Sequence, residues 1–187
     1  MPLTKLDTNA ALVVIDLQKG IIAPPTAPHP AADIVGRAAQ LAKAFRDKNL
    51  PVVFVNVTGA PPGRVNIQRP GGARAANWAE LAADLHVEPT DAALSKQRWG
   101  AFIGTSMHEF LQTHNVTQIF LVGIATTIGV ESTARSAFDY GYNVVMVVDA
   151  MTDRDADAHR NSVEKIFPRL GETELTENVL QMLRSAP

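Results

Sequence analysis

Residues 118–141 read QIFLVGIATTIGVESTARSAFDYG, and this stretch decides the fold. It opens with an apolar run, Ile119–Val122, which has the length and the composition of a fully buried strand. Gly123 ends the run, and a turn of small residues leads into a segment whose apolar residues recur three and four positions apart, a spacing typical of a helix. Gly141 follows the last periodic residue, where a helix commonly ends. A strand, a tight turn and a helix form the unit of α/β proteins, and ligands bind beside such turns.

The rest of the chain repeats this alternation of strands and helices. Further strands are expected over residues 11–17, 52–57, 93–98, 143–148 and 172–175, and further helices over residues 31–48, 78–85, 107–114, 153–167 and from Thr176 onward. Connections through helices make such a sheet parallel and cover both of its faces. Because we find no repeat and no linker, we expect a single α/β domain over residues 1–187.

Polar residues at two helix starts favour capping. Ser106 and Glu109 have the spacing of a capping box, which predicts a helix beginning at Met107. Thr127 is placed to act as the N-cap of the helix that follows the 118–122 strand.

The composition argues against several classes of function. A net charge of −2 gives no basic footprint for nucleic acid. The chain has no cysteine, which excludes disulfides, thiolate metal sites and a cysteine nucleophile. The N-terminal segment has one short apolar run with Asp16 inside it, which is typical neither of a signal peptide nor of a membrane span. We therefore expect a cytoplasmic protein with no nucleic acid and no membrane among its partners.

Asp16 lies near the C-terminal end of the first apolar run. A carboxylate is costly to bury unless it is paired or hydrogen-bonded. The carboxyl ends of the strands are also where open α/β sheets bind ligands. Position alone leaves two interpretations open: Asp16 is a functional carboxylate, or it caps a turn or pairs with a structural base.

The longest irregular stretch, residues 59–77, contains Arg64, Arg69 and Arg74 and no acidic residue. Long loops in compact domains are often functional, and an arginine here is suited to bind a substrate carboxylate. A solvent-exposed loop is the alternative for any one of these arginines. The five histidines are scattered without the spacing of metal ligands, so we predict no catalytic metal.

Three motifs, in order, resemble those of the isochorismatase-like hydrolases, a superfamily that also contains nicotinamidases and N-carbamoylsarcosine amidases. Residues 123–145, GIATTIGVESTARSAFDYGYNVV, are similar to the active-site segment. Residues 13–18, VVIDLQ, resemble the first strand with its catalytic aspartate, and residues 95–107, SKQRWGAFIGTSM, resemble the lysine segment. The resemblance covers nearly the whole chain.

The resemblance implies a Rossmann-like three-layer α/β/α sandwich with a six-stranded parallel sheet in the order 3-2-1-4-5-6. Asp16 and Lys96 would be the aspartate and lysine of the catalytic triad. The Ile124–Ala125 peptide bond would be cis, and the backbone N–H groups of Ala125 and Gly129 would form an oxyanion-type hole. The family further implies a small-molecule substrate, a homodimer or homotetramer, and no cofactor.

One position departs from most of the family: Gly129 stands where the nucleophilic cysteine is expected. The thioester route of the amidases is therefore closed. True isochorismatases are similar in having glycine there, and they hydrolyse a vinyl ether after an aspartic acid protonates the enol carbon. By this resemblance Asp16 is the acid and Lys96 holds it, and the reaction converts isochorismate to dihydroxy-dihydrobenzoate and pyruvate.

Other residues are expected to contact the substrate, although aromatic residues at such positions more often serve only packing. These are Asn56, Arg64, Trp99 and Phe102. Two alternatives stay open. The first is a small-molecule-binding protein that lost catalysis with the cysteine. The second is an amidase in which a hydroxyl of Thr126, Thr127 or Ser132 replaces the thiol.

Overall fold

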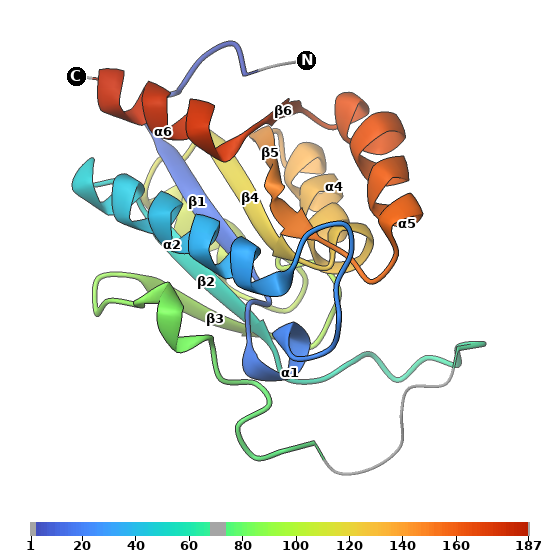
Figure 1. The fold of residues 1–187 in the computed structure, drawn as a ribbon. Helices are drawn as coiled ribbons and strands as arrows, with labels where there is room; N and C mark the ends of the chain where they lie inside the picture. Colours follow the sequence, from blue (N-terminus) through green and yellow to red (C-terminus); the bar gives the residue numbers. More distant parts are fainter. Residues whose placement is uncertain (1–2, 68–73, 187) are drawn as a thin grey trace.

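Six parallel strands form one sheet in the order β3-β2-β1-β4-β5-β6 (Figure 1). The strands are β1 (Ala10–Ile15), β2 (Val52–Val57), β3 (Ala92–Lys96), β4 (Gln118–Ile124), β5 (Asn143–Thr152) and β6 (Glu172–Glu174). The computed structural model describes residues 3–67 and 74–186, so Arg69 lies outside the described residues. The strand order is the predicted one, and the predicted fold class is confirmed.

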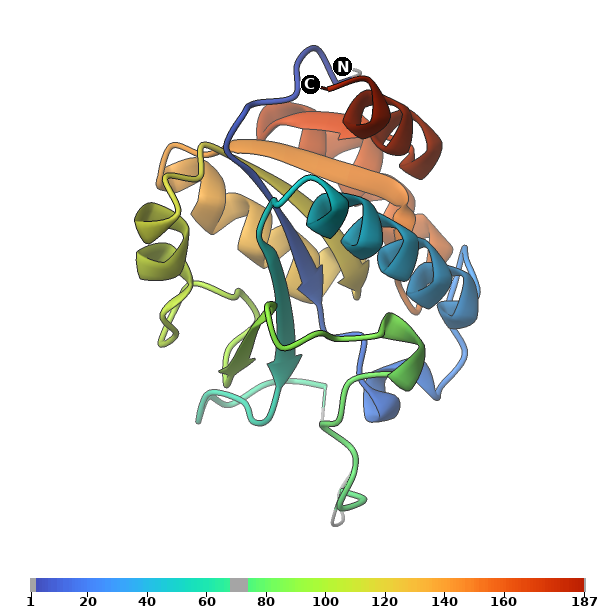
Figure 2. The same ribbon diagram turned by 90° about the vertical axis from the view of Figure 1, so that its left-hand side faces the viewer.

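Helices cover both faces of this sheet (Figures 1 and 2). They are α1 (Lys19–Ile22), α2 (Ala31–Asp47), η1 (Ala83–Leu85), α3 (Met107–Thr113), η2 (Thr126–Val130), α4 (Glu131–Asp139), α5 (Ala156–Asn161), η3 (Ser162–Ile166), η4 (Phe167–Arg169) and α6 (Thr176–Ser185). Helices α2 and α6 pack against one face, whereas α3 and α4 pack against the other. The result is the three-layer sandwich expected of alternating strands and helices.

The core divides along β1, whose six residues are all fully buried. Alternate side chains of a strand point to opposite faces. Leu12 and Val14 therefore join the apolar cluster under α2 and α6, whereas Val13 and Ile15 join the cluster under α3 and α4. A strand buried on both faces reads as a continuous apolar run, which is why the sequence pattern identified it.

The strands β1 and β4 approach each other closely where both end. Gly123 has a φ of +124°, and a Cβ there would lie 2.0 Å from the carbonyl oxygen of Ile15, so only glycine fits. Asp16, the next residue after β1, also has a positive φ, of 53°. A non-glycine residue in this conformation is uncommon and often marks a functional site. The fold thus places Asp16 and the turn after β4 side by side at the carboxyl edge of the sheet.

Three local expectations are wrong. The helix expected over residues 78–85 is limited to η1, and the short helix α1 forms after Asp16, where no helix was expected. The Ser106–Glu109 capping box does not form, because Ser106 makes no side-chain cap and Thr105 Oγ1 accepts the Met107 N–H instead, at 3.2 Å. Short polar segments of this kind depend on tertiary contacts rather than on their own propensity.

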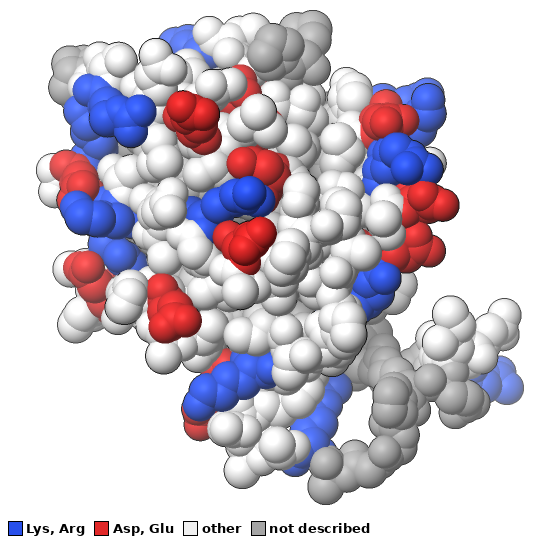
Figure 3. Space-filling model, viewed as in Figure 1, with Lys and Arg blue, Asp and Glu red and all other residues white. Residues whose placement is uncertain are grey.

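The surface seen in Figure 3 carries acidic and basic side chains interspersed, without a field of one sign. None of the helices within residues 3–67 and 74–186 has the length and apolar character needed to cross a bilayer.

Candidate active site

A buried ion pair joins the ends of β1 and β3. The Lys96 ammonium donates to Asp16 Oδ2 at 2.7 Å and to the carbonyl oxygen of Arg98 at 3.2 Å. Asp16 is 6% exposed and Lys96 is 2% exposed. Because parallel strands end at the same edge of the sheet, two residues 80 positions apart meet here, with the end of β2 between them. The structure thus brings together the two residues predicted to act as acid and partner.

The second oxygen of the Asp16 carboxyl, Oδ1, has no hydrogen bond to offset the cost of its burial within the described part of the chain. Burial raises the pKa of Asp16 to about 6, although the charge and the hydrogen bond of Lys96 act in the opposite direction. Asp16 is therefore able to hold a proton on Oδ1 at about pH 6, well above the usual range of a carboxyl, while Oδ2 stays bound to Lys96.

A pocket of about 240 Å³ opens over this pair. Its apolar walls include Ile21, Trp78, Trp99 and Ile128. Asp16 is the one carboxylate among its described lining residues, whereas the cationic side chains that line it are Arg74, Lys96, Arg98 and Arg154. A small cavity with apolar walls and several cations suits a compact anionic ligand.

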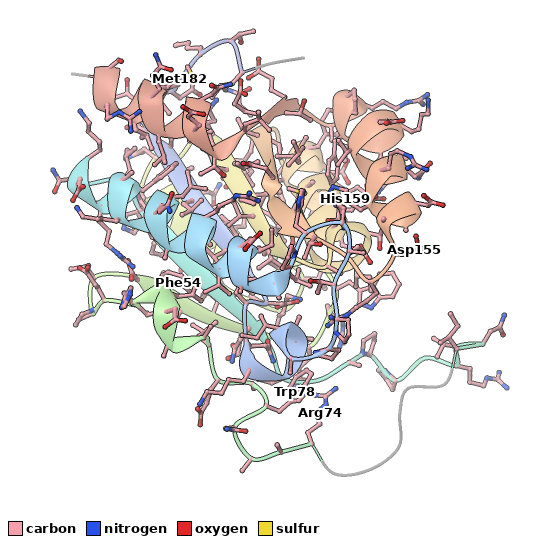
Figure 4. All side chains as sticks on the ribbon, viewed as in Figure 1. Phe54, Arg74, Trp78, Asp155, His159 and Met182 are labelled. Carbon is pink, nitrogen blue, oxygen red and sulfur yellow. The ribbon has the colours of Figure 1, made fainter. Side chains whose placement is uncertain are left out.

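Two of the arginines are held in place by neighbouring groups. The Arg74 guanidinium lies 3.9 Å from the centre of the Trp78 ring and donates to the carbonyl oxygen of Thr58 at 3.1 Å (Figure 4). Arg154 donates to three backbone carbonyls of the segment that begins in α1, including that of Pro24 at 2.7 Å. These contacts fix the arginines at the rim while leaving further N–H groups for a ligand.

The sequence of the whole domain identifies its family. The family model described as "Isochorismatase domain" matches residues 10–178. The chain belongs to the isochorismatase family.

Individual members of the family extend this assignment. The chain is 38% identical to the isochorismatase family protein YecD of Escherichia coli O157:H7, over 95% of this chain and 100% of that protein. The structure of an isochorismatase family protein from Burkholderia thailandensis superimposes with a TM-score of 0.92 at 39% identity, covering 96% of this chain and 97% of that one. The isochorismatase of Bacillus subtilis is 27% identical over 97% of this chain and 60% of that protein.

The turn that follows β4 has the family's predicted cis peptide bond, Ile124–Ala125. Ala125 lines the pocket, and Gly129 lies against the buried ion pair. A Cβ on Gly129 would lie 3.1 Å from Asp16 Oδ2 and 2.8 Å from Ile15 Cγ2. The oxyanion role of the Ala125 and Gly129 N–H groups stays a prediction.

Replacing Gly129 by alanine is expected to lower kcat/KM of the reaction proposed below by about 10-fold, because the added Cβ requires the Asp16 carboxyl to shift by a few tenths of an ångström. Overpacking against Ile15 should also destabilise the fold by about 1–3 kcal/mol. Gly36→Ala in α2 is the matched control: its Cβ meets nothing within 4 Å, so it should leave activity unchanged and stabilise the helix by about 0.5–1 kcal/mol. Equal activity of the two variants would contradict this prediction.

The threonine hydroxyls of the turn are engaged elsewhere. Thr126 Oγ1 forms a hydrogen bond of 2.8 Å with His159 Nδ1, and burial lowers the pKa of that histidine. The prediction that Thr127 is the N-cap is wrong. Thr127 lies inside η2, and its hydroxyl donates to Asp153 Oδ2 at 2.8 Å. Neither threonine lines the pocket, and neither does Ser132. The site therefore does not favour a hydroxyl nucleophile.

Of the four predicted substrate contacts, Trp99 lines the pocket and is 55% exposed. The other three do not line it. Asn56 is used structurally, donating to the carbonyl oxygen of Ala79 and accepting from Ser95. Phe102 is buried in the core under α3 and α4, and Arg64 is exposed in the segment that follows β2.

Sequence reasoning missed several pocket residues. Arg154 lies two residues after the end of β5 and Arg98 two residues after the end of β3, so both lie at the carboxyl edge where ligands are expected. The rule that open α/β sheets bind ligands at the carboxyl ends of their strands could have identified both arginines from the sequence. Trp78 and Ile128 carried no such signal, because their positions depend on how the irregular segments fold back over the sheet.

Proposed function

We propose that this protein is a hydrolase of a small anionic metabolite in which Asp16 acts as a general acid on a vinyl ether. The observation that carries the proposal is the Asp16 carboxyl: it is buried, one oxygen is bound by Lys96, the other has no hydrogen-bond partner among the described residues, and Asp16 lines a pocket with several cations. Gly129, beside it, offers no side-chain nucleophile.

The reaction that fits is the hydrolysis of isochorismate, which has two carboxylates and an enolpyruvyl ether. Protonated Asp16 would transfer its proton to the terminal enol carbon, and the positive charge that develops on the ether carbon is shared with its oxygen. Water then adds to that carbon and returns a proton to Asp16, and the hemiketal collapses to pyruvate and the ring diol. The family relationship to the Bacillus subtilis isochorismatase supports this choice of substrate.

The pocket cations have two roles in this scheme. Lys96 keeps the Asp16 carboxyl oriented through Oδ2. Arg74, Arg98 and Arg154 line the pocket and are suited to bind the substrate carboxylates. Their positive charge also attracts an anionic substrate into the pocket.

The pH dependence of kcat/KM tests this role of Asp16. Because the protonated form is the active one and the pKa of Asp16 is raised to about 6, activity should fall about tenfold per pH unit above that value. The dependence of kcat/KM on pH is obtained from pyruvate release from isochorismate, measured from about pH 5 to about pH 9, a range that includes this pKa. A rate that rises with pH across this window would indicate a base instead and would contradict the proposal.

The alternative is a binding protein that keeps the pocket without catalysis. It predicts that the protein binds small carboxylates, such as pyruvate, and shows no turnover. Calorimetric titration with pyruvate, alongside the turnover assay, distinguishes the two functions. The cost of burying the Asp16–Lys96 pair favours the enzyme, because a binder does not require it.

A further inference from the structure

Asp153 is a second buried carboxylate beside the turn after β4, and the proposed reaction does not use it. It lies directly after β5 and is 4% exposed. Its Oδ2 accepts the N–H of Thr127 at 2.7 Å and the hydroxyl of Thr127 at 2.8 Å, and its Oδ1 accepts the N–H of Arg154 at 2.7 Å. Within residues 3–67 and 74–186, no lysine or arginine forms an ion pair with it.

These three donors compensate for the burial of the charge. They include the first turn of η2, where helical N–H groups lack partners within the helix and favour a negative charge. The residue before η2, Ala125, makes no side-chain cap. Asp153, directly after the neighbouring strand β5, therefore performs the capping that Ala125 cannot provide.

The turn that Asp153 caps is a wall of the pocket. Ala125 and Ile128, on either side of Thr127, line the pocket, and Gly129 lies against the Asp16 carboxyl. The backbone of Asp153 is itself fixed by two hydrogen bonds to Ala27, of 2.8 and 3.0 Å. A movement of Thr127 would therefore change how closely the turn covers Asp16.

We propose that Asp153 is a positioning residue which, by holding Thr127, keeps the 125–129 turn packed against the Asp16 carboxyl and keeps water away from it. The inference deepens the proposed function, and rests on it, because an acid needs this shielding to hold its proton at neutral pH. Burial is the main cause of the raised pKa of Asp16, so a loosened turn should lower that pKa.

Other charged groups must be considered in such a test. Those that share the pocket with Asp16 are Arg74, Lys96, Arg98 and Arg154. Those near Asp153 are Arg154 and His159. A substitution at Thr127 leaves all of them in place and changes no charge.

The titration of Asp16, followed by carbon-13 NMR of labelled aspartate carboxyls, tests the proposal directly. Asp16→Asn identifies the signal. In Thr127→Val, which removes the hydroxyl, the midpoint should fall by about half a pH unit or more, whereas Thr127→Ser, which keeps the hydroxyl, should leave it unchanged. Thr113→Val is the matched control, because the Thr113 hydroxyl bonds only within α3 in the described structure, to Glu109.

Asp153→Asn extends the test, because its amide presents a donor where the native residue presents an acceptor. If this variant folds, as judged by circular dichroism, its Asp16 midpoint should also fall. If it does not fold, Thr127→Val decides. An unchanged midpoint in folded Thr127→Val, even with a loss of stability, would overturn the proposal. The titration observes Asp16 itself, so a failure to hydrolyse isochorismate would count against the proposed function and not against this inference.

Discussion

Replacing Asp16 by asparagine is expected to lower kcat by about 1,000-fold or more while changing KM little. Asparagine has nearly the same shape and can still accept from Lys96, but it has no proton to give to the enol carbon. Removing a central catalytic group typically costs several orders of magnitude in rate. Steady-state kinetics of pyruvate release measures both constants.

The matched control for this substitution is Asp157→Asn, which makes the same chemical change on the exposed surface of α5. It should have the activity of the unmodified protein. If Asp16→Asn instead retains kcat, or raises KM alone, then Asp16 binds the substrate and does not protonate it.

Replacing Lys96 by methionine is expected to lower the free energy of unfolding by about 3–5 kcal/mol at neutral pH, because it leaves the Asp16 charge buried without its partner. Methionine keeps most of the side-chain volume, so the loss is electrostatic. Urea denaturation measures it. Lys43→Met, which removes an exposed partner of Asp47, is the control and should cost about 0.5 kcal/mol or less.

The pH dependence of this loss provides its own check. The pKa of Asp16 in the folded protein is raised from 3.8 to about 6, so protonation favours the folded state. That contribution is fully present below about pH 4 and is lost as the pH rises through about 6. The cost of Lys96→Met should therefore shrink in acid. Combining it with Asp16→Asn should recover part of the stability at neutral pH, and an additive loss in the double variant would contradict this account.

The architecture was largely predictable because its signals are local. The apolar runs that became β1, β2, β4 and β5 are bounded by glycine, proline and polar residues, and their alternation with helices requires a parallel sheet. The strand order itself came from the family resemblance. Strand and helix patterns do not encode which strands are neighbours.

The site was predictable to the extent that residues lie at strand ends. Asp16 directly follows β1 and Lys96 ends β3, and they meet as expected. Asn56 also lies in a strand near that edge, but its amide faces Ala79 and Ser95 instead of the pocket.

Irregular segments account for the errors. Arg64 lies in the long stretch of residues 59–77 and Trp78 directly follows that stretch. Arg64 is exposed and does not line the pocket, whereas Trp78 lines it. Their positions depend on contacts such as the packing of the Trp78 ring against Gly20, where a Cβ would lie 1.9 Å from the indole. No sequence pattern within the segment reports such a contact.

The most direct test of the central claim is the release of pyruvate from isochorismate in water enriched in oxygen-18, with Asp16→Asn as the reference. Protonation of the enol carbon followed by water attack predicts turnover that collapses in the variant, and a ring diol that keeps the unlabelled ether oxygen. Turnover no faster than that of the variant, or labelled oxygen in the ring hydroxyl, would contradict acid-assisted vinyl-ether hydrolysis by Asp16.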